Sequence, residues 1–268
     1  MQRIKHWKRI LLPYTQAVEE LKVKFKSIRN EFRDMNEYSP IEFVTGRVKK
    51  ISSILEKASR RNITEDKIEE EIEDIAGIRI MCQFVDDIYE VVELIRRRSG
   101  KDLDIVYEKD YIKNYKESGY RSYHVIIRYP VQTALGEKKI LAEIQIRTLA
   151  MNFWATVEHS LNYKYKKNIP EEVRDRLRKA SEAAHQLDKE MYTIRNEIIN
   201  AQKLFEEKSS SVYEISNNIQ LLNLFGYKEE AREFQSKFDK IWINGTLEEL
   251  QKLSESIKYA IQRYQAFD

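Results

Sequence analysis

Polar side chains alternate with apolar ones in one short stretch of the sequence, EIQIRT at residues 143–148. In a β-strand, alternate side chains point to the same face, so Glu143, Gln145 and Arg147 would share one face. A carboxylate between an amide and a guanidinium could bind a metal ion or accept a proton. The solvated face of a one-sided sheet shows the same alternation. This stretch alone therefore leaves a functional and a structural interpretation open.

A second carboxylate, Asp74, ends an acidic run at residues 65–74 and lies two positions before the apolar stretch AGIRIMC, which begins at Ala76. Two carboxylates from neighbouring strands, such as Asp74 and Glu143, would suit Mg²⁺, which prefers oxygen ligands and phosphate co-ligands. The residues from Asp66 to Glu71 are interpreted as a solvated helix face. Asp74 is set apart from them by its position at the start of a strand.

Positive charge is concentrated between residues 47 and 61, where the cations are Arg47, Lys49, Lys50, Lys57, Arg60 and Arg61. Ser53, Lys57 and Arg60 follow one another at spacings of four and three, so they would share one helix face. That face could bind a polyphosphate, although basic helices are also simply solvated or bind nucleic acid loosely. Arg79 lies inside an apolar strand and must find an anion, either a structural carboxylate or a substrate phosphate.

The stretch KESGYRSYH at residues 116–124 has the composition of a nucleotide-binding segment. Gly119 would let the backbone approach a ligand closely, and Tyr120 offers a ring on which a base can stack. Lys116, Arg121 and His124 could contact phosphate oxygens.

Hydrophobic periodicity predicts an α+β protein with about five strands and a largely helical C-terminal part. The predicted strands are 42–48, 76–84, 103–108, 122–131 and 138–148, the last two forming an antiparallel pair joined by a loop with Gly136. The predicted helices are 14–35, 50–61, 86–98, 148–166, 171–207, 212–225, 228–241 and 246–266.

One predicted helix carries an apolar seam that alternates steps of three and four, from Leu177 to Phe205. The seam must be covered either by its own domain or by another subunit. The stretch EEKSSSVYE at 206–214 is the best candidate for a linker. We therefore expect one domain over residues 1–207 and a helical extension over residues 208–268.

Composition narrows the class of protein. The chain has 268 residues and a formal net charge of +3, too balanced for a general nucleic-acid coat. Its single cysteine, Cys82, excludes intrachain disulfides and a cysteine-rich zinc site. No apolar run approaches the ~20 residues that span a bilayer. A cytoplasmic protein is expected.

Four segments together, EDIAGIRI, KESGYRSYH, EIQIRT and FWATVEH, resemble the (p)ppGpp synthetase domain of the RelA/SpoT group. The compact chain resembles the small alarmone synthetases of the RelQ type from about residue 7 to about residue 205. The resemblance implies a mixed β-sheet with flanking helices, related to nucleotidyltransferases. It also implies transfer of pyrophosphate from ATP to the 3′-hydroxyl of GDP or GTP, with AMP and ppGpp or pppGpp as products.

The resemblance also implies roles for individual residues. It places Arg47 and Arg79 around the adenine and assigns ATP phosphate contacts to Lys49, Ser53, Lys57 and Arg60. Asp74 and Glu143 match the acids of a Mg²⁺ site, with Glu143 also placed to take the acceptor proton. Tyr120 matches the tyrosine that stacks on guanine, and the other acceptor contacts match Lys109, Lys116, His124, Gln145 and Asn152.

Long members of this group also carry hydrolase and regulatory domains, which this sequence lacks, so synthesis without hydrolysis is expected. The resemblance to RelQ-type proteins implies a homotetramer with a (p)ppGpp effector cleft between subunits. Lys26, Arg29, Phe43 and Thr45 would lie in this cleft. Two other interpretations stay open. A nucleotidyltransferase would use the same acids but release pyrophosphate, and a regulator could bind single-stranded RNA through its basic helix and tyrosines.

Overall fold

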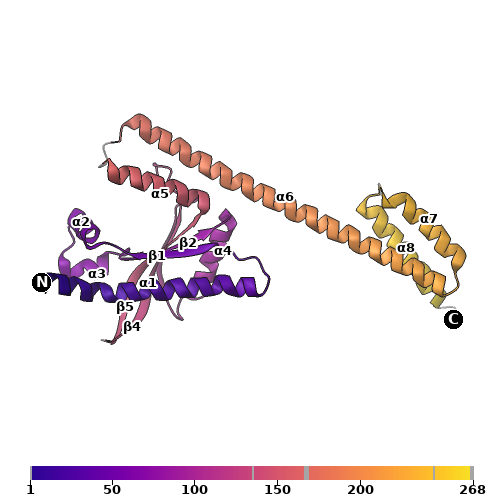
Figure 1. Ribbon diagram of the computed structural model, residues 1–268, viewed down its shortest axis with the longest axis horizontal. Coiled ribbons are helices and arrows are strands. Elements are labelled where there is room, and N and C mark those ends of the chain that lie inside the picture. Colours follow the sequence, from indigo (N-terminus) through magenta and orange to yellow (C-terminus); the bar gives the residue numbers. More distant parts are fainter. Residues whose placement is uncertain (1, 135, 166–168, 244, 266–268) are drawn as a thin grey trace. The chain divides into compact units, whose positions relative to one another are not determined.

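The computed structural model describes residues 2–134, 136–165, 169–243 and 245–265 (Figure 1). Its chain forms two compact units, residues 1–192 and residues 193–268, and each is described by itself. The division lies inside a helix, fifteen residues before the predicted boundary at 207/208.

The first unit is built on a mixed five-stranded sheet, as predicted. Its strands are β1 (Phe43–Val48), β2 (Ala76–Cys82), β3 (Asp104–Asp110), β4 (Tyr123–Thr133) and β5 (Gly136–Thr148). They lie in the order β1-β2-β5-β4-β3, and only the β2–β5 pair is parallel. The parallel pair is the centre of the sheet, and it joins the segments that contain Asp74 and Glu143.

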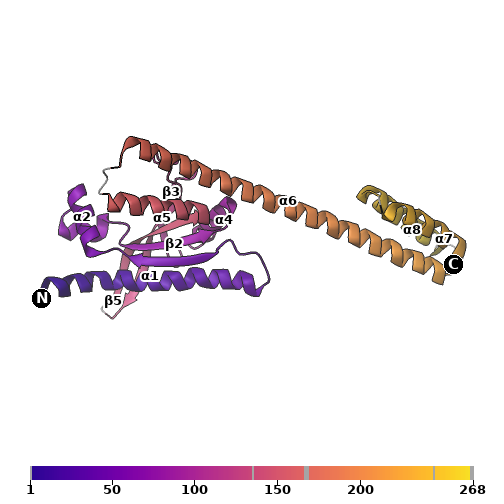
Figure 2. The same cartoon turned by 45° about the horizontal axis from the view of Figure 1, so that its top comes forward.

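One face of this sheet is apolar and covered by two helices, α1 (Gln2–Asp34) and α4 (Val85–Arg96). Figures 1 and 2 show α1 running along this face, opposite α5. The fully buried side chains here include Leu21 and Phe25 of α1, Ile88 and Val91 of α4, and Ile78, Ile80, Ile144 and Ile146 of the strands.

The helix α1 begins at Gln2, twelve residues before its predicted start. The predicted start at residue 14 directly follows Pro13, a residue type that removes a backbone donor and normally ends a helix. The helix continues through Pro13, and its extra turns bury Trp7 in the sheet core. Tertiary packing has overridden a local signal.

A single connection, residues 49–75, links β1 to β2. It contains α2 (Ile51–Arg61), a 3₁₀ turn (Glu65–Lys67) and α3 (Ile68–Glu71). Asp66 and Glu71 are exposed, as expected for a solvated face, whereas Ile68 anchors the turn in the core.

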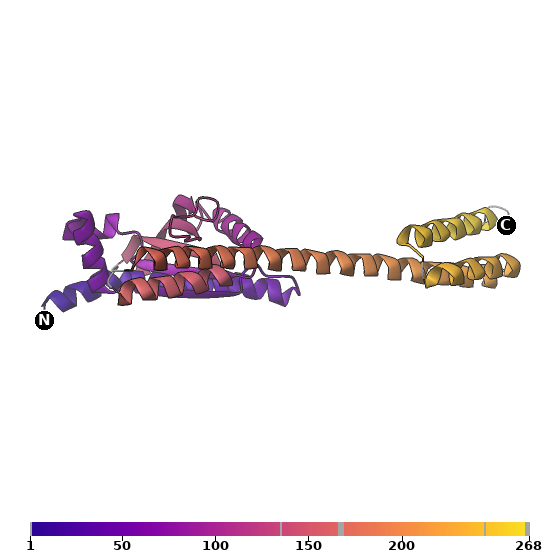
Figure 3. The ribbon, with the colours of Figure 1, turned by 90° about the horizontal axis from the view of Figure 1, so that it is seen from above.

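The helix α5 (Leu149–Lys164) follows β5 directly, and the hydroxyl of Thr148 accepts a hydrogen bond from Met151 N at its start. It lies on the polar side of the sheet beside the first turns of α6 (Glu171–Leu224), as Figure 3 shows. The indole of Trp154 donates to Leu177 O at 2.8 Å and joins the two helices.

The prediction of a linker at residues 206–214 is wrong, because α6 runs through these residues without a break. Serine is only a moderately poor helix former. The Ser211 hydroxyl donates to Glu207 O at 3.0 Å, so this polar side chain finds its partner within the helix. The predicted helices 171–207 and 212–225 are therefore one element.

The second unit packs the end of α6 against α7 (Lys228–Trp242) and α8 (Leu247–Gln265). Its own core contains Ile215, Ile219, Leu222, Ala231, Phe238, Leu250, Leu253 and Ile257. The α6 residues Ile215, Ile219 and Leu222 continue the predicted seam and are covered by α7 and α8. Upstream, Ile194, Ile198 and Phe205 are exposed on the same helix.

No helix among the described residues is long and apolar enough to cross a bilayer.

Candidate functional site

The strand register gathers polar side chains on the sheet face away from α1. Gln145 of β5 lies between Arg79 of β2 and His124 of β4, and His124 lies opposite Lys109 of β3. Glu143 lies opposite Gly77, a residue with no side chain, which leaves space beside the carboxylate. Alternation within each strand thus builds one polar row across four strands.

A pocket of about 480 Å³ opens over this row. It is lined by Arg47, Lys49, Asp74, Arg79, Lys116, Ser118, Tyr120, His124, Glu143, Gln145, Arg147, Ala155, Thr156, Glu158 and His159. Nine of the predicted site residues are in this lining, contributed by β1, β2, β4, β5 and the segments beside them.

Asp74 is held by two lysines at the β2 end of the pocket. Lys49 Nζ lies 2.6 Å from Asp74 Oδ2, and Lys57 Nζ lies 2.8 Å from Oδ1. Burial alone would raise the pKa of Asp74, but the hydrogen bonds and charges of the two lysines hold it below its ordinary value. Asp74 is therefore an anion at neutral pH. Its ion pair with Lys57 links that lysine of α2 to the pocket.

Glu143 is held by two donors in the middle of the row. His124 Nδ1 lies 2.8 Å from Oε1, and Gln145 Nε2 donates to Oε2 at 2.8 Å. Burial is the largest effect and raises the pKa of Glu143, and the like charge of Asp74 also raises it. The hydrogen bonds and charge of His124 and the hydrogen bond of Gln145 outweigh both, so the pKa of Glu143 lies below its ordinary value. A buried carboxylate in this state can accept a proton from a bound hydroxyl group.

A closed ring of hydrogen bonds joins this carboxylate to Tyr120. The Tyr120 hydroxyl lies 2.7 Å from His124 Nε2 and accepts from Arg147 Nη2 at 2.6 Å. Arg147 Nη2 also donates to Gln145 Oε1 at 2.8 Å, which closes the ring through Glu143. A neutral His124 with its hydrogen on Nδ1 satisfies every one of these bonds.

Arg47 and Arg79 line the β1–β2 side of the pocket, and neither forms an ion pair with any carboxylate of the described residues. Burial first, then the neighbouring charges of Arg147 and Arg47, lower the pKa of Arg79. Of the two anions considered for Arg79, a structural carboxylate is therefore ruled out within the described chain. The cluster is suited to a bound polyphosphate.

Five predicted site residues lie outside the pocket lining, and one of them, Lys57, is joined to it through Asp74. Ser53 and Arg60 are on α2, and Lys109 is exposed on β3 with its ammonium 4.6 Å from the Tyr107 ring centroid. Asn152 is on α5, where its Oδ1 is buried without a hydrogen-bond partner in the described chain.

Two residues of KESGYRSYH serve packing rather than a ligand. Gly119 has φ +89°, and a Cβ there would lie 2.7 Å from Cβ of Ser181 on α6. Arg121 is buried and pairs with Glu182 at 2.8 Å. The expectation that Arg121 contacts phosphate, and that Gly119 makes room for a ligand, is therefore corrected: both fasten this segment to α6.

Six residues of the lining were not assigned a site role from the sequence, and three of them carry titratable side chains, namely Arg147, Glu158 and His159. Arg147 belongs to the polar row of EIQIRT. Glu158 and His159 come from FWATVEH, where the one-turn spacing from Ala155 to His159 on α5 could have shown that they face the strands.

The expected effector residues are grouped at the junction of α1 and β1. Arg29 Nη1 donates to Glu42 O at 3.3 Å, immediately before Phe43. Lys26 and Thr45 are exposed. The side chain of Phe43 is 37% exposed.

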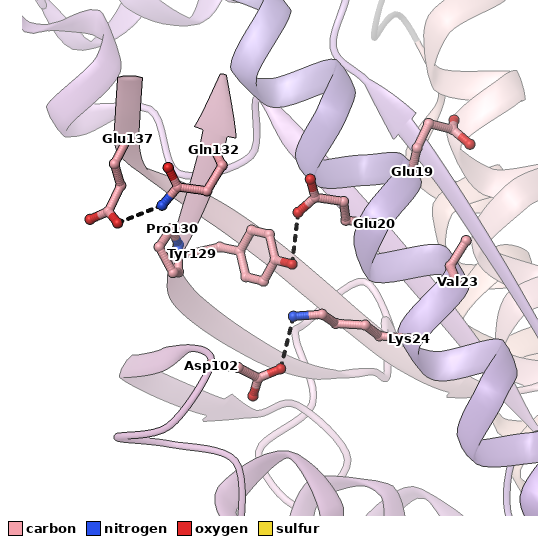
Figure 4. A pocket seen from close by; sticks show the side chains of 9 residues that line it. All are labelled: Glu19, Glu20, Val23, Lys24, Asp102, Tyr129, Pro130, Gln132 and Glu137. Atoms are coloured by element: carbon pink, nitrogen blue, oxygen red, sulfur yellow. Dashed lines mark hydrogen bonds and ion pairs between the residues drawn. The ribbon is translucent and has the colours of Figure 1, made fainter. Parts of the chain in front are cut away.

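A larger pocket, of about 610 Å³, lies between α1 and the β4–β5 hairpin (Figure 4). Its polar side chains already pair with one another: Lys24 with Asp102, Tyr129 with Glu20, and Gln132 with Glu137. Convergent groups with unsatisfied charge are the mark of a catalytic pocket, so the smaller pocket is the candidate active site.

The chain has clear relatives among known proteins. Residues 46–168 match the family described as "Region found in RelA / SpoT proteins". The chain is 61% identical over 204 residues to the GTP pyrophosphokinase YjbM of Bacillus subtilis, covering 76% of this chain and 95% of that protein.

Solved structures of a small alarmone synthetase are also similar to this chain. The small alarmone synthetase 1 of B. subtilis bound to its product pppGpp has a TM-score of 0.69 at 61% identity, covering 72% of this chain and 98% of that one. The same synthetase bound to AMPCPP has a TM-score of 0.64 at 57% identity, covering 73% and 99%. The chain belongs to the RelA/SpoT family, among its small alarmone synthetases.

Proposed function

We propose that this protein is a GTP pyrophosphokinase, which transfers the pyrophosphoryl group of ATP to the 3′-hydroxyl of GDP or GTP. The observation that carries the proposal is the pocket that joins unpaired guanidinium groups, two ionised carboxylates and an aromatic ring on one sheet face. The 61% identity to a GTP pyrophosphokinase supports this chemistry.

The donor half of the pocket lies over β1 and β2. Arg47 and Arg79 are placed to enclose the adenine or the phosphates of ATP, and Lys49 is beside them. Lys57 is 2.8 Å from Asp74, and Ser53 and Arg60 extend the same α2 face outward. Cationic positioning of the phosphates is the main requirement of phosphoryl-type transfer.

The acceptor half lies over β4 and β5. The ring of Tyr120 offers a stacking surface for guanine, beside Lys116 and His124. Lys109 and Asn152 stay predicted acceptor contacts at the edges of this half. A bound acceptor would bring its 3′-hydroxyl near Glu143.

The proposed step is a single displacement. Glu143 takes the proton of the 3′-hydroxyl, and the 3′-oxygen forms a bond to the β-phosphorus of ATP. The bond from that phosphorus to the α,β-bridging oxygen breaks, and AMP leaves with the negative charge on its phosphate. The products are AMP and ppGpp from GDP, or AMP and pppGpp from GTP.

Mg²⁺ fits the donor set. Asp74 and Glu143 offer carboxylate oxygens, and the charge of Asp74 acts on Glu143 across the pocket. The described residues contain no group of three or more acidic, histidine or cysteine side chains suited to a metal, so phosphate and water would complete the coordination, as Mg²⁺ prefers. Bound Mg²⁺ supplies positive charge that offsets the triphosphate.

The activity is proposed to be synthesis alone. A metal-dependent hydrolase needs its own cluster of histidines and carboxylates, and the described chain contains none. Release of pyrophosphate from ppGpp by the pure protein would contradict this part of the proposal.

The assembly is proposed to be a homotetramer with a (p)ppGpp effector site at Lys26, Arg29, Phe43 and Thr45, as in the resemblance to RelQ-type proteins. Exposed apolar residues support an interface between copies, among them Phe43, Ile198 and Phe205. Light scattering on the purified chain should give four times the chain mass of 32.1 kDa. A monomer would refute the tetramer.

An isotope experiment tests the reaction type. With the β- and γ-phosphates of ATP labelled, the label should appear on the 3′ position of the guanosine product. A nucleotidyltransferase would instead release the label as pyrophosphate. If both nucleotides stay unchanged, the synthetase proposal fails and titration with single-stranded RNA becomes the next experiment.

A further inference from the structure

Arg147 is a buried guanidinium to which the proposed reaction gives no role. It lies one residue before the end of β5, is 4% exposed and lines the active-site pocket. It forms no ion pair with a carboxylate of the described residues. Burying a charge without an opposite charge costs stability, so its retention in the pocket calls for a function.

The partners of Arg147 are neutral side chains, and two of them, Tyr120 and Gln145, line the acceptor half of the pocket. Nη2 donates to the Tyr120 hydroxyl at 2.6 Å and to Gln145 Oε1 at 2.8 Å, and Nε donates to Ser122 Oγ at 3.2 Å. The planar fork of a guanidinium fixes its partners relative to one another better than a single ammonium does.

The first consequence concerns the ring of Tyr120. Its hydroxyl is held from two sides, by Arg147 and by His124 at 2.7 Å. The guanidinium carbon of Arg147 lies 5.1 Å from the ring centroid. The ring is therefore fixed in place before a base arrives, which reduces the entropy lost when the base stacks on it.

The second consequence concerns the amide of Gln145. A guanidinium has only donors, so it requires the oxygen end of the amide to face it. The nitrogen end of Gln145 is then directed at Glu143 Oε2, 2.8 Å away. Arg147 at the oxygen end and Glu143 at the nitrogen end thus fix the same orientation of the amide, and loss of Arg147 removes one of these two restraints.

We propose that Arg147 is a positioning residue for the acceptor nucleotide, which acts through the Tyr120 hydroxyl and the Gln145 amide rather than by touching ATP. This inference rests on the proposed function and extends it. The buried side chain of Arg147 holds both the stacking ring of Tyr120 and, through Gln145, the carboxylate of Glu143 in position for the acceptor.

A double-mutant cycle separates this role from direct contact with substrate. The variants are Arg147→Met, Tyr120→Phe and the two combined, with Arg128→Met as a control at an exposed position of the neighbouring strand. The phenylalanine keeps the stacking ring and removes only the hydroxyl that Arg147 binds. Initial rates are measured while GDP and ATP are varied separately.

The expected result is selective and non-additive. Arg147→Met should raise the KM for GDP about tenfold, equivalent to about 1.4 kcal/mol, and lower kcat, while the KM for ATP changes less than about twofold. Because both changes break the same contact, the double variant should show a KM for GDP close to that of the worse single variant. The control should match the wild type.

Two results would overturn the inference. If the effects on the KM for GDP multiply, Arg147 acts independently of Tyr120. If the KM for ATP rises as much as that for GDP, Arg147 contacts ATP or supports the whole pocket. Because Arg147 is buried, Arg147→Lys serves in the same cycle if the methionine variant does not fold.

Failure of the proposed function would look different, because the wild type itself would then make no alarmone. Calorimetric titration of GDP into the same four proteins gives the cycle without catalysis. Additive losses of GDP affinity there would refute the positioning role in the absence of turnover.

Discussion

Glu143 combines burial with two hydrogen-bond donors, which keep it charged while leaving it accessible from the pocket. Tyr120 differs from it because the role proposed for its ring is to stack on a base, without taking part in bond breaking. The two residues therefore contribute to different steps, and substitutions should separate them.

Glu143→Gln should lower kcat more than Tyr120→Ala. A positioned base contributes about 10²–10⁴-fold to the rate, whereas stacking contributes about 1–3 kcal/mol per base, chiefly to binding. Steady-state rates with GDP varied should show a fall in kcat for the first variant and a rise in KM for the second. Equal losses in kcat would refute the assignment of Glu143 as the base.

At the scale of one residue, Asp188 should make the stability of the folded chain depend on pH. Burial raises its pKa to about 6, against the smaller opposing effects of Thr148 and Arg121. The folded chain thus binds this proton more tightly than the unfolded chain, whose carboxyl has its ordinary pKa of 3.8. The stabilising effect is complete below about pH 4 and is lost as the pH rises through about 6.

Asp188→Asn should remove this dependence, because an amide does not titrate and its oxygen can still accept from Thr148. The Tm of the wild type, measured relative to the variant, should fall between pH 4 and pH 7. A constant difference across that range would show that Asp188 has no raised pKa.

At the scale of elements, the acceptor segment 116–124 owes its conformation to α6. Gly119 packs against Ser181, and Arg121 binds Ser181 and Glu182 of the same helix. Tyr120, between these two residues, is thereby placed over the pocket. The stability of this contact should determine how well the acceptor binds.

Gly119→Ala should lower stability and weaken GDP binding. The positive φ costs a non-glycine residue about 1–3 kcal/mol, and the added Cβ would also meet Ser181 at 2.7 Å. Gly100→Ala is the matched control, because Gly100 has φ +79° and nothing within 4 Å of its Cβ position. Equal Tm losses in the two variants would mean that the contact with α6 is unimportant.

Elements whose signals are local could be predicted from the sequence. Glu143 and Gln145 share a face because a strand has a period of two, and this period predicted the row correctly. Arg147 was on that row, but its burial depends on Tyr120, which is distant in sequence. The roles of Gly119 and Arg121 depend on Ser181, about sixty residues away, so no local pattern could reveal them.

Helix ends were the weakest predictions for the same reason. Pro13 and the serines before Val212 are local signals for a break, yet both lie inside helices. Trp7 shows why in the first case, since burial of its side chain favours the extra turns. Packing of this kind is decided by the whole fold.

At the scale of the whole molecule, the two units have separate hydrophobic cores. The proposed active site uses only residues of the first unit. The domain division therefore predicts that the second core can be weakened without affecting the chemistry.

Leu222→Ala should destabilise the second unit by about 2–5 kcal/mol, the usual cost of truncating a buried leucine, and leave kcat unchanged. Leu222 is 0% exposed, whereas the control Leu224→Ala removes a side chain that is 81% exposed on the same helix. Calorimetry should show one of two transitions shifted by the first variant and neither by the control. A parallel loss of kcat would show that the units are coupled.

The most direct test of the central claim is chromatography of the nucleotides after the purified protein is incubated with ATP, Mg²⁺ and GDP, beside Glu143→Gln. We predict one AMP for each ppGpp formed by the wild type, and neither product from the variant. Unchanged nucleotides, or pyrophosphate in place of AMP, would contradict the account of this pocket as a pyrophosphoryl-transfer site.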